Sequence, residues 1–409
     1  MTFFNILAIL LCLSAVFSYL NHRYLHLPTT IGLMFIALVM SLCLLALGRL
    51  GIAVHRGATT LLLSVDFNQA LMHGMLAFLL FAGALHINLN DLAKQKWIVG
   101  VFAVGSVIIS TFVIGFLTMW TFDWLGHPMA LQYGLLFGAL ISPTDPVAVI
   151  GILRISGAPK TLETSIAGES LFNDGMGVVV FLVLMELVNG NQQIEVNSIA
   201  VLFFKEALGG AIFGAVVGWL AYRALKTVDN YHVELLITLA LVGGGYAMAD
   251  TLEISGPIAI VVAGLMIGNH GRLFAMSDTT REHLDAFWEL VDEILNAVLF
   301  VLVGLEVLVL PFTGLHLIAG IAAVLIVLLA RYISVGLPVI LMRPFLPLSH
   351  HIVKIMTWGG LRGGISVAMA LSLPPDQSRS VIVAMTYAVV VFSVLVQGST
   401  FGRMVRAYS

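Results

Sequence analysis

The sequence predicts an all-α polytopic membrane protein with about thirteen transmembrane helices. Hydrophobic residues make up 60% of its 409 residues and charged residues only 10%, against roughly 25% charged in ordinary globular proteins. The apolar residues lie in continuous runs, whereas the strands of an outer-membrane barrel alternate between apolar and polar residues. A chain with this composition cannot cover its surface with polar groups, so we expect the bilayer to be its solvent.

Runs of about 20 apolar residues, the length that a helix needs to cross a bilayer, recur along the whole chain. They cover residues 3–20, 28–48, 69–87, 97–122, 128–153, 162–189, 196–224, 232–250, 254–268, 284–309, 312–342, 351–372 and 379–402. The first run has no basic residues before it, which is typical of a retained helix and not of a cleaved signal peptide. Because the loops are short, we interpret residues 1–409 as a single transmembrane domain.

The distribution of Lys and Arg predicts the orientation, because cytoplasmic loops collect these residues. With thirteen spans, one side of the membrane holds Arg23, Lys94, Lys96, Arg154, Lys160, Arg223, Lys226, Arg272, Arg281, Arg343, Lys354, Arg403 and Arg406. The other side holds only Arg49, Arg56 and Arg379. We therefore expect a protein of the cell membrane with its N-terminus outside and its C-terminus in the cytoplasm.

Thirteen spans divide into six, one and six. We expect residues 1–190 and 231–409 to form two six-helix repeats of inverted topology, with a linker helix in 191–230, an arrangement typical of secondary transporters. Spans 5 and 12 would then correspond to each other. Both are interrupted near the middle by prolines or glycines together with a charge, so we expect broken, crossing helices at these two places in the core.

The interruption of span 5 is Ser142-Pro143-Thr144-Asp145-Pro146. Two prolines this close together remove backbone hydrogen bonds from a helix, and the freed carbonyl oxygens can bind a cation. Asp145 followed by proline also fits the N-cap of a new helix. The two roles are compatible.

Span 6 carries Glu169, Ser170, Asn173 and Asp174 within two helical turns. Ser170 and Asp174 share one face of the helix, and Glu169 and Asn173 share the neighbouring face. Ionisable residues at bilayer depth are costly and mark ion or proton pathways. Asp174 is therefore the main candidate for an ion site, whereas a buried salt bridge alone could explain Glu169.

Two arginines lie inside spans: Arg331 in span 11 and Arg362 at the interruption of span 12. A buried arginine stays charged and needs a counter-charge. Glu169 is the natural partner for one of them, and both are interpreted as structural or electrostatic residues. The remaining acidic residues near span ends are interpreted as mostly interfacial: Glu234, Asp250, Glu289, Asp292, Glu293 and Glu306. For Asn296 an interhelical hydrogen bond is the expected role.

These segments resemble the sodium/proton exchanger family, the monovalent cation/proton antiporters, and in length its bacterial NhaP-type members. The resemblance rests on Thr144-Asp145-Pro146-Val147-Ala148-Val149, Glu169-Ser170-Leu171-Phe172-Asn173-Asp174-Gly175, Ser255-Gly256-Pro257-Ile258-Ala259, Leu295-Asn296-Ala297-Val298-Leu299-Phe300 and Gly359-Gly360-Leu361-Arg362-Gly363-Gly364. It covers nearly the whole chain.

The resemblance implies a homodimer in which a core containing spans 5, 6, 12 and 13 moves as an elevator. It implies that Asp174 carries both the cation and the proton. Ser170, the Thr144 carbonyl and Asp145 would complete a Na⁺ site with Asp174. It further implies a Glu169 salt bridge to Arg331 with Arg362 nearby. Some archaeal relatives add a glutamate from span 3, which this sequence lacks.

The chemistry of these residues predicts the stoichiometry. Na⁺ is a hard cation that takes oxygen ligands, and a proton would compete with it for Asp174. A second aspartate at position 173 would favour two protons per cation, but Asn173 adds no charge. With Glu169 held by an arginine, we expect electroneutral exchange of one Na⁺ (or Li⁺) for one H⁺.

Several alternatives remain open. K⁺/H⁺ exchange by the same mechanism is the main one; a cation channel and an intramembrane aspartic protease are remote, and we expect no enzyme activity. Cys12 and Cys43 lie within apolar runs and the histidines are mostly in loops, so no disulfide framework, metal centre or cofactor is expected. A net charge of −3 argues against nucleic acid as a partner.

Overall fold

The computed structural model describes residues 3–50, 70–155, 160–189, 196–310, 313–344, 351–374 and 377–408. These residues form helices and connecting segments and contain no strand. The predicted loop that holds Arg56 and the predicted repeat boundary after residue 190 lie outside the described residues.

Each predicted span overlaps one or more helices in the structure. The α-helices are α1 (Phe3–Leu20), α2 (Thr29–Arg49), α5 (Leu76–Leu85), α6 (Leu89–Lys94), α7 (Lys96–Gly100), α8 (Ser106–Trp124), α9 (Leu131–Ile141), α10 (Val147–Ile155), α11 (Lys160–Asn189), α12 (Val196–Leu225), α13 (Tyr231–Thr251), α14 (Gly256–Met266), α15 (Arg272–Phe274), α16 (Asp278–Glu306), α17 (Gly314–Met342), α18 (Ile352–Trp358), α19 (Gly364–Leu371), α20 (Gln377–Phe392) and α21 (Ser399–Tyr408). The π-helical turns are η1 (Asn21–Leu25), η2 (Ala70–Met75), η3 (Val101–Gly105), η4 (Ile267–Gly271) and η5 (Ser393–Gly398). Among the described residues, eight helices are long and apolar enough to cross a membrane, and the count of thirteen spans stays a prediction.

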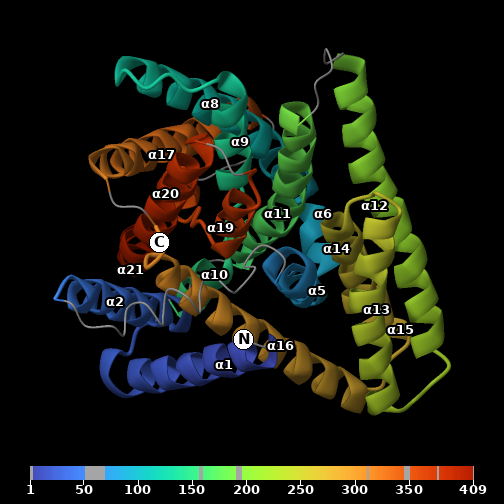
Figure 1. Cartoon of the computed structure of the whole chain (residues 1–409). Coiled ribbons are helices and arrows are strands. Elements are labelled where there is room, and N and C mark those ends of the chain that lie inside the picture. The colour runs from blue at the N-terminus through green and yellow to red at the C-terminus, as the bar shows by residue number, and fades with distance from the viewer. Residues whose placement is uncertain are drawn as a thin grey trace.

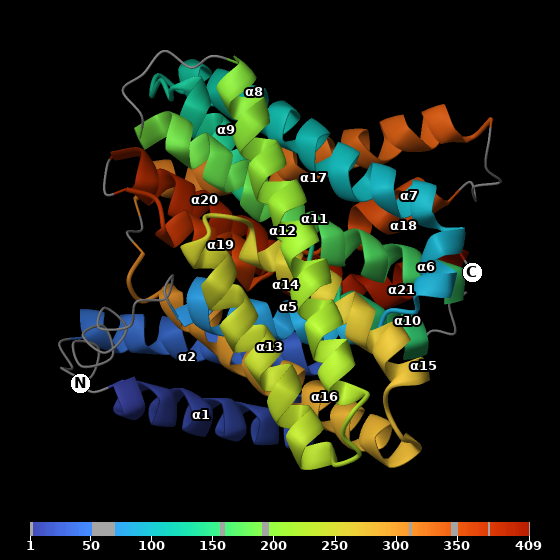
Figure 2. The ribbon, with the colours of Figure 1, turned by 90° about the vertical axis from the view of Figure 1, so that its right-hand side faces the viewer.

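The helices pack in two groups (Figure 1). In the first group, α8 packs on α9 and α17, and α17 packs on α20. In the second, α2 packs on α16, and α14 packs on α5 and α12. Figure 2 shows α12 running along the outside of the second group beside α13. Helix α11 contacts both groups, through α9 and through α14.

Large apolar side chains on α12 point away from the protein, as expected for a helix in contact with lipid. The exposed ones are Val201, Phe204, Leu208, Ile212, Val216, Trp219 and Leu220. Polar caps fix the starts of the neighbouring helices: the Ser255 hydroxyl accepts from the Ile258 N–H before α14, and Ser277 accepts from the Thr280 N–H before α16. Such caps satisfy backbone donors that the first helical turn leaves free.

Both predicted interruptions are present. Helix α9 ends at Ile141 and α10 begins at Val147; α18 ends at Trp358 and α19 begins at Gly364. The two interruptions lie together, because the Asp145 N–H donates a hydrogen bond of 2.8 Å to the Leu361 carbonyl. The inverted-repeat relation between the two halves of the chain stays a prediction.

Candidate functional site

Asp145 caps the helix that follows the first interruption. Its Oδ1 accepts a hydrogen bond of 2.9 Å from the Val147 N–H, and the Ile150 N–H donates to the Pro146 carbonyl over 2.8 Å. The N-cap role is thus present in the structure. This hydrogen bond comes from a neutral donor and uses only one of the two carboxylate oxygens. The Asp145 carboxylate can therefore still interact electrostatically with nearby charged groups.

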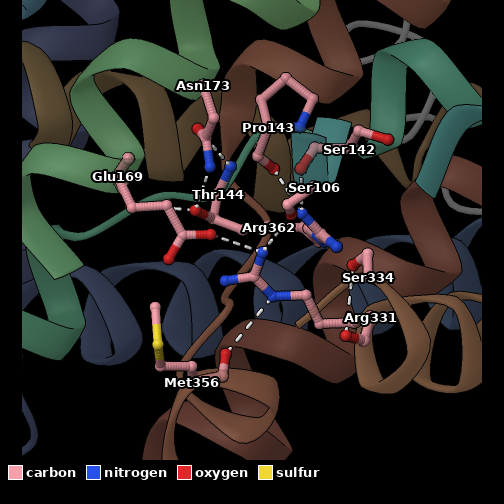
Figure 3. Close-up of polar contacts among 11 residues, drawn as sticks. Ser106, Ser142, Pro143, Thr144, Glu169, Asn173, Arg331, Ser334, Met356 and Arg362 are labelled. Carbon is pink, nitrogen blue, oxygen red and sulfur yellow. Dashed lines mark hydrogen bonds and ion pairs between the residues drawn. The ribbon is translucent and has the colours of Figure 1, made fainter. Parts of the chain in front are cut away.

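Helix α11 and the first interruption are joined by hydrogen bonds between buried side chains (Figure 3). The Thr144 N–H donates to Asn173 Oδ1 over 3.1 Å, and Asn173 Nδ2 donates to Thr144 Oγ1 over 2.8 Å. The hydroxyls of Thr144 and Ser170 are 2.9 Å apart. Asn173 therefore holds the interruption in place with both ends of its amide, and three of the predicted site residues form one network.

The second interruption supplies Arg362, which is 1% exposed. Its Nη1 donates hydrogen bonds to the carbonyl oxygens of Ser142 and Pro143, the latter over 2.9 Å. Its backbone N–H donates to Ser393 Oγ over 2.9 Å. We expected the carbonyls freed by the prolines to be available to a cation. Two of these carbonyls instead accept hydrogen bonds from Arg362. The buried guanidinium needs acceptors, and the carbonyls of the interrupted helix need donors.

Glu169 pairs with Arg331, which settles the partner that the sequence left open. Glu169 Oε1 lies 2.6 Å from Arg331 Nη1, and the two side chains are 2% and 3% exposed. Arg331 also donates to Ser106 Oγ over 3.0 Å and to the Met356 carbonyl over 3.4 Å (Figure 3). The pair ties α11 to α17 and α18, and its charges balance each other.

Asp174 is 8% exposed. Within the part of the chain that the structure describes, its carboxylate makes no hydrogen bond and no ion pair. It interacts electrostatically with Asp145 and with Arg362. A buried carboxylate without a bonded partner is energetically unfavourable as an anion. Either a bound cation or a bound proton would remove this cost.

Sequence reasoning missed Ser106 and Ser393, which bind the two arginines. Each is a lone hydroxyl within an otherwise apolar run, and small polar residues at bilayer depth commonly satisfy buried polar groups of other helices. Their presence in the runs was visible, but their partners lie 225 and 31 residues away in the chain. Only the folded structure identifies them.

Gly363 gives a testable prediction about Asp145. A Cβ added at Gly363 would lie 2.6 Å from Asp145 Oδ2. The backbone at Gly363 is extended, with φ −108°, so alanine is conformationally allowed and only the contact changes. We expect Gly363→Ala to displace the Asp145 carboxylate and to lower ion-dependent transport severalfold in reconstituted vesicles.

Gly151→Ala is the matched control for that variant. Gly151 lies in α10, four residues after Val147, and a Cβ there meets nothing within 4 Å. The change should leave transport intact and stabilise the helix by about 0.5–1 kcal/mol. Normal transport by Gly363→Ala would show that the position of the Asp145 carboxylate does not matter.

A helical membrane fold in which two broken helices meet beside buried carboxylates and arginines defines a membrane transport protein. The family model for the transmembrane sodium/hydrogen exchanger matches residues 9–407. The chain belongs to this family. It is 48% identical to the Na⁺/H⁺ antiporter NhaP of Pseudomonas aeruginosa, over 98% of this chain and 96% of that protein.

Other comparisons agree. The chain is 33% identical to the Na⁺/H⁺ antiporter NhaH of Halobacillus dabanensis, over 93% of this chain and 91% of the relative. Its fold is similar to that of the sodium proton antiporter MjNhaP1 from Methanocaldococcus jannaschii at pH 8, with a TM-score of 0.79 and 19% identity over 98% of this chain and 97% of that one.

Proposed function

We propose that this protein exchanges Na⁺ (or Li⁺) for H⁺ across the cell membrane, with Asp174 as the carrier of both. The observation that carries the proposal is the Asp174 carboxylate, which is buried and unpaired among the described residues and lies one helical turn after Ser170, whose hydroxyl is 2.9 Å from that of Thr144. Hard monovalent cations favour such oxygen ligands. Membership of the sodium/hydrogen exchanger family supports the choice of ions.

The proposed Na⁺ site consists of Asp174, Ser170, Thr144 and Asp145. The Ser170 and Thr144 hydroxyls share a hydrogen bond. Thr144 Oγ1 also accepts from Asn173 Nδ2, so the Thr144 hydroxyl keeps a lone pair for a cation when it is the donor to Ser170. The Thr144 carbonyl is the next one after the two that accept from Arg362, and it would supply the backbone ligand. Asn173 would position Thr144, and the Glu169–Arg331 pair would hold α11 against α17 without adding net charge.

Coupling follows from the charge of Asp174. We propose an elevator movement of the helices around the two interruptions relative to the group that contains α2, α5 and α16. With Asp174 ionised and empty, this movement would carry an uncompensated charge through an apolar barrier at a cost of several kcal/mol. Either Na⁺ or H⁺ neutralises the carboxylate, so the carrier crosses when loaded with one of the two and exchange is obligatory.

The stoichiometry should make the exchange insensitive to voltage. Asn173 adds no titrating charge, and Glu169 is paired with Arg331 at 2.6 Å, so one carboxylate exchanges one Na⁺ for one H⁺. We expect the initial rate in proteoliposomes to be the same with and without an imposed membrane potential. A severalfold change in rate on a potential jump would contradict electroneutral exchange.

Three further features of the proposal concern the architecture, the orientation and the choice of cation. The two inverted repeats (1–190 and 231–409, with the linker in 191–230) rest on the six, one, six division of the predicted spans, and the homodimer rests on resemblance to the family. The orientation, with the C-terminus in the cytoplasm, rests on the distribution of Lys and Arg. A K⁺/H⁺ exchanger is less favoured because the close relatives are named as Na⁺/H⁺ antiporters.

The test is proton flux in proteoliposomes that carry a preset pH gradient and a lumenal pH dye. Na⁺, Li⁺ and K⁺ are added in turn, with voltage clamped by valinomycin and K⁺ for the first two. Collapse of the pH gradient on adding Na⁺ is the expected result. Collapse of the gradient with K⁺ alone would mean that the same mechanism transports K⁺ in place of Na⁺. If no cation causes proton movement, antiport is refuted.

A further inference from the structure

A short stretch of the last span, residues 392–401, contacts the second interruption at several points. It consists of the last residue of α20, the π-helical turn η5 and the start of α21. Gln397 Nε2 donates a hydrogen bond of 3.2 Å to the carbonyl oxygen of Trp358, the last residue of α18. The indole Nε1 of Trp358 donates a second one, of 2.9 Å, to Thr400 Oγ1. Both the backbone and the side chain of Trp358 are therefore bound to the last span.

Aromatic packing adds to these two hydrogen bonds. Phe401 is fully buried and lies so close to Gly359 that a Cβ added there would be 2.8 Å from Phe401 Cε2. The ring of Phe392 meets that of Trp358 edge to face, with centroids 6.4 Å apart. Gln397 is itself only 4% exposed. A buried amide inside an apolar span is costly unless it is hydrogen-bonded, so its bond to the interruption is a specific feature of this place.

The second interruption in turn fixes the first one. Ser393, in the same stretch, accepts from the backbone N–H of Arg362, and the Arg362 guanidinium donates to two carbonyls of the first interruption. The Leu361 carbonyl accepts from the Asp145 N–H over 2.8 Å. Hydrogen bonds thus connect the last span to residues 358–362 and those residues to the segment that carries two proposed Na⁺ ligands.

We propose that Gln397 and Thr400 are positioning residues that set the size selectivity of the cation site by fixing the second interruption. This inference rests on the proposed function. The Trp358 carbonyl would bind within a continuous helix, but the interruption leaves it without that partner, and the Gln397 amide replaces it. With residues 358–362 fixed, Arg362 stays on its two carbonyls and Asp145 stays at Leu361.

The size of the bound cation is the property that this arrangement controls. Selectivity among hard cations depends on the size of the site, the number of oxygen ligands and their freedom to move. A displacement of the interruptions would separate the oxygen atoms of the proposed site. Li⁺ needs closer oxygen atoms than Na⁺ does, so its affinity should fall further when the site loosens.

Gln397→Met is the main test, because methionine has nearly the same length and packs well in a core but donates no hydrogen bond. The measurement is the cation dependence of proton flux in proteoliposomes. The apparent KM for Na⁺ should rise about tenfold, as for the loss of a hydrogen bond that orients a metal ligand, and the KM for Li⁺ should rise further. The maximal rate should stay within about twofold of wild type, because Asp174 still carries the ion.

A pair of substitutions at Thr400 tests the other hydrogen bond. Thr400→Val removes the acceptor for the Trp358 indole with little change in shape, so it should raise both KM values in the same order. Thr400→Ser keeps the hydroxyl and should keep both KM values close to wild type. If Gln397→Met does not fold, as judged by its Tm, this pair decides the question.

Ser399→Ala is the matched control. Ser399 is exposed, precedes Thr400 in the chain, and donates its hydroxyl to the carbonyls of Leu395 and Val396 in its own segment. Its KM values should not change, and an equal rise in this variant would overturn the inference. A lower maximal rate at unchanged KM in the test variants would also overturn it, since the contacts would then serve folding alone.

A second measurement follows binding without transport. The Na⁺ concentration that gives half of the maximal rise in Tm of the purified protein should increase by the same factor in Gln397→Met, and an unchanged concentration would count against the inference. If the wild-type protein shows no Na⁺-driven flux, the proposed function fails as well. A normal wild-type flux with unaltered kinetics in Gln397→Met and Thr400→Val overturns only the role of these two residues.

Discussion

Asp174→Asn is expected to abolish Na⁺-driven proton flux. Asparagine keeps the size of the side chain but neither binds a proton near neutral pH nor offers a negative charge to Na⁺. The 8% exposed position should accept the neutral amide without loss of folding, because burial favours the uncharged form. The measurement is the dye signal of reconstituted vesicles on addition of Na⁺, which should match that of empty vesicles.

Glu186→Gln is the control for this variant. Glu186 lies on the same helix, α11, and is exposed, so the substitution removes an equal charge away from the site. Its flux should equal that of wild type. Thermal melting of the purified Asp174→Asn protein would separate loss of function from loss of fold. A correctly folded Asp174→Asn protein with substantial Na⁺-driven flux would refute the carrier assignment.

The second large effect is expected on stability. Replacing Glu169 by Gln leaves the charge of Arg331 buried, at 3% exposure and with only neutral hydrogen-bond partners. Breaking a buried ion pair from one side typically costs about 3–5 kcal/mol of unfolding free energy. We expect Glu169→Gln to melt well below wild type in detergent, as followed by tryptophan fluorescence.

The double variant Glu169→Gln, Arg331→Met tests the origin of that loss. It removes both charges, so it should recover a large part of the stability that the single variant loses. Glu253→Gln is a useful reference, because both side chains of the Lys205–Glu253 ion pair are exposed. This variant should melt close to wild type. A double variant that is no more stable than Glu169→Gln would mean that packing, and not the unpaired charge, accounts for the effect.

Much of the site could be predicted from local sequence. Thr144 and Asp145 follow a helix-breaking proline, and Ser170, Asn173 and Asp174 fall within two turns of one span. Helical spacing places those three at neighbouring positions. The structure adds the contact between the two segments, through the Asn173 and Thr144 hydrogen bonds over 29 residues of sequence.

The pairing of charges could not be predicted in the same way. Arg331 and Arg362 both lie at bilayer depth, and either could reach Glu169. The structure directs Arg331 to Glu169 and Arg362 to the carbonyls of the first interruption.

The sequence by itself determined the fold class, the two interruptions and the identity of the carboxylate that is the candidate carrier. Those features depend on composition, on proline and glycine within apolar runs, and on spacing within one helix, all of which act locally. Only the tertiary structure decided that the interruptions meet at Asp145 and Leu361, that Arg362 binds two freed carbonyls, and that Glu169 pairs with Arg331. Buried charges and backbone groups select their partners by proximity across helices, and proximity between distant segments exists only in the folded chain.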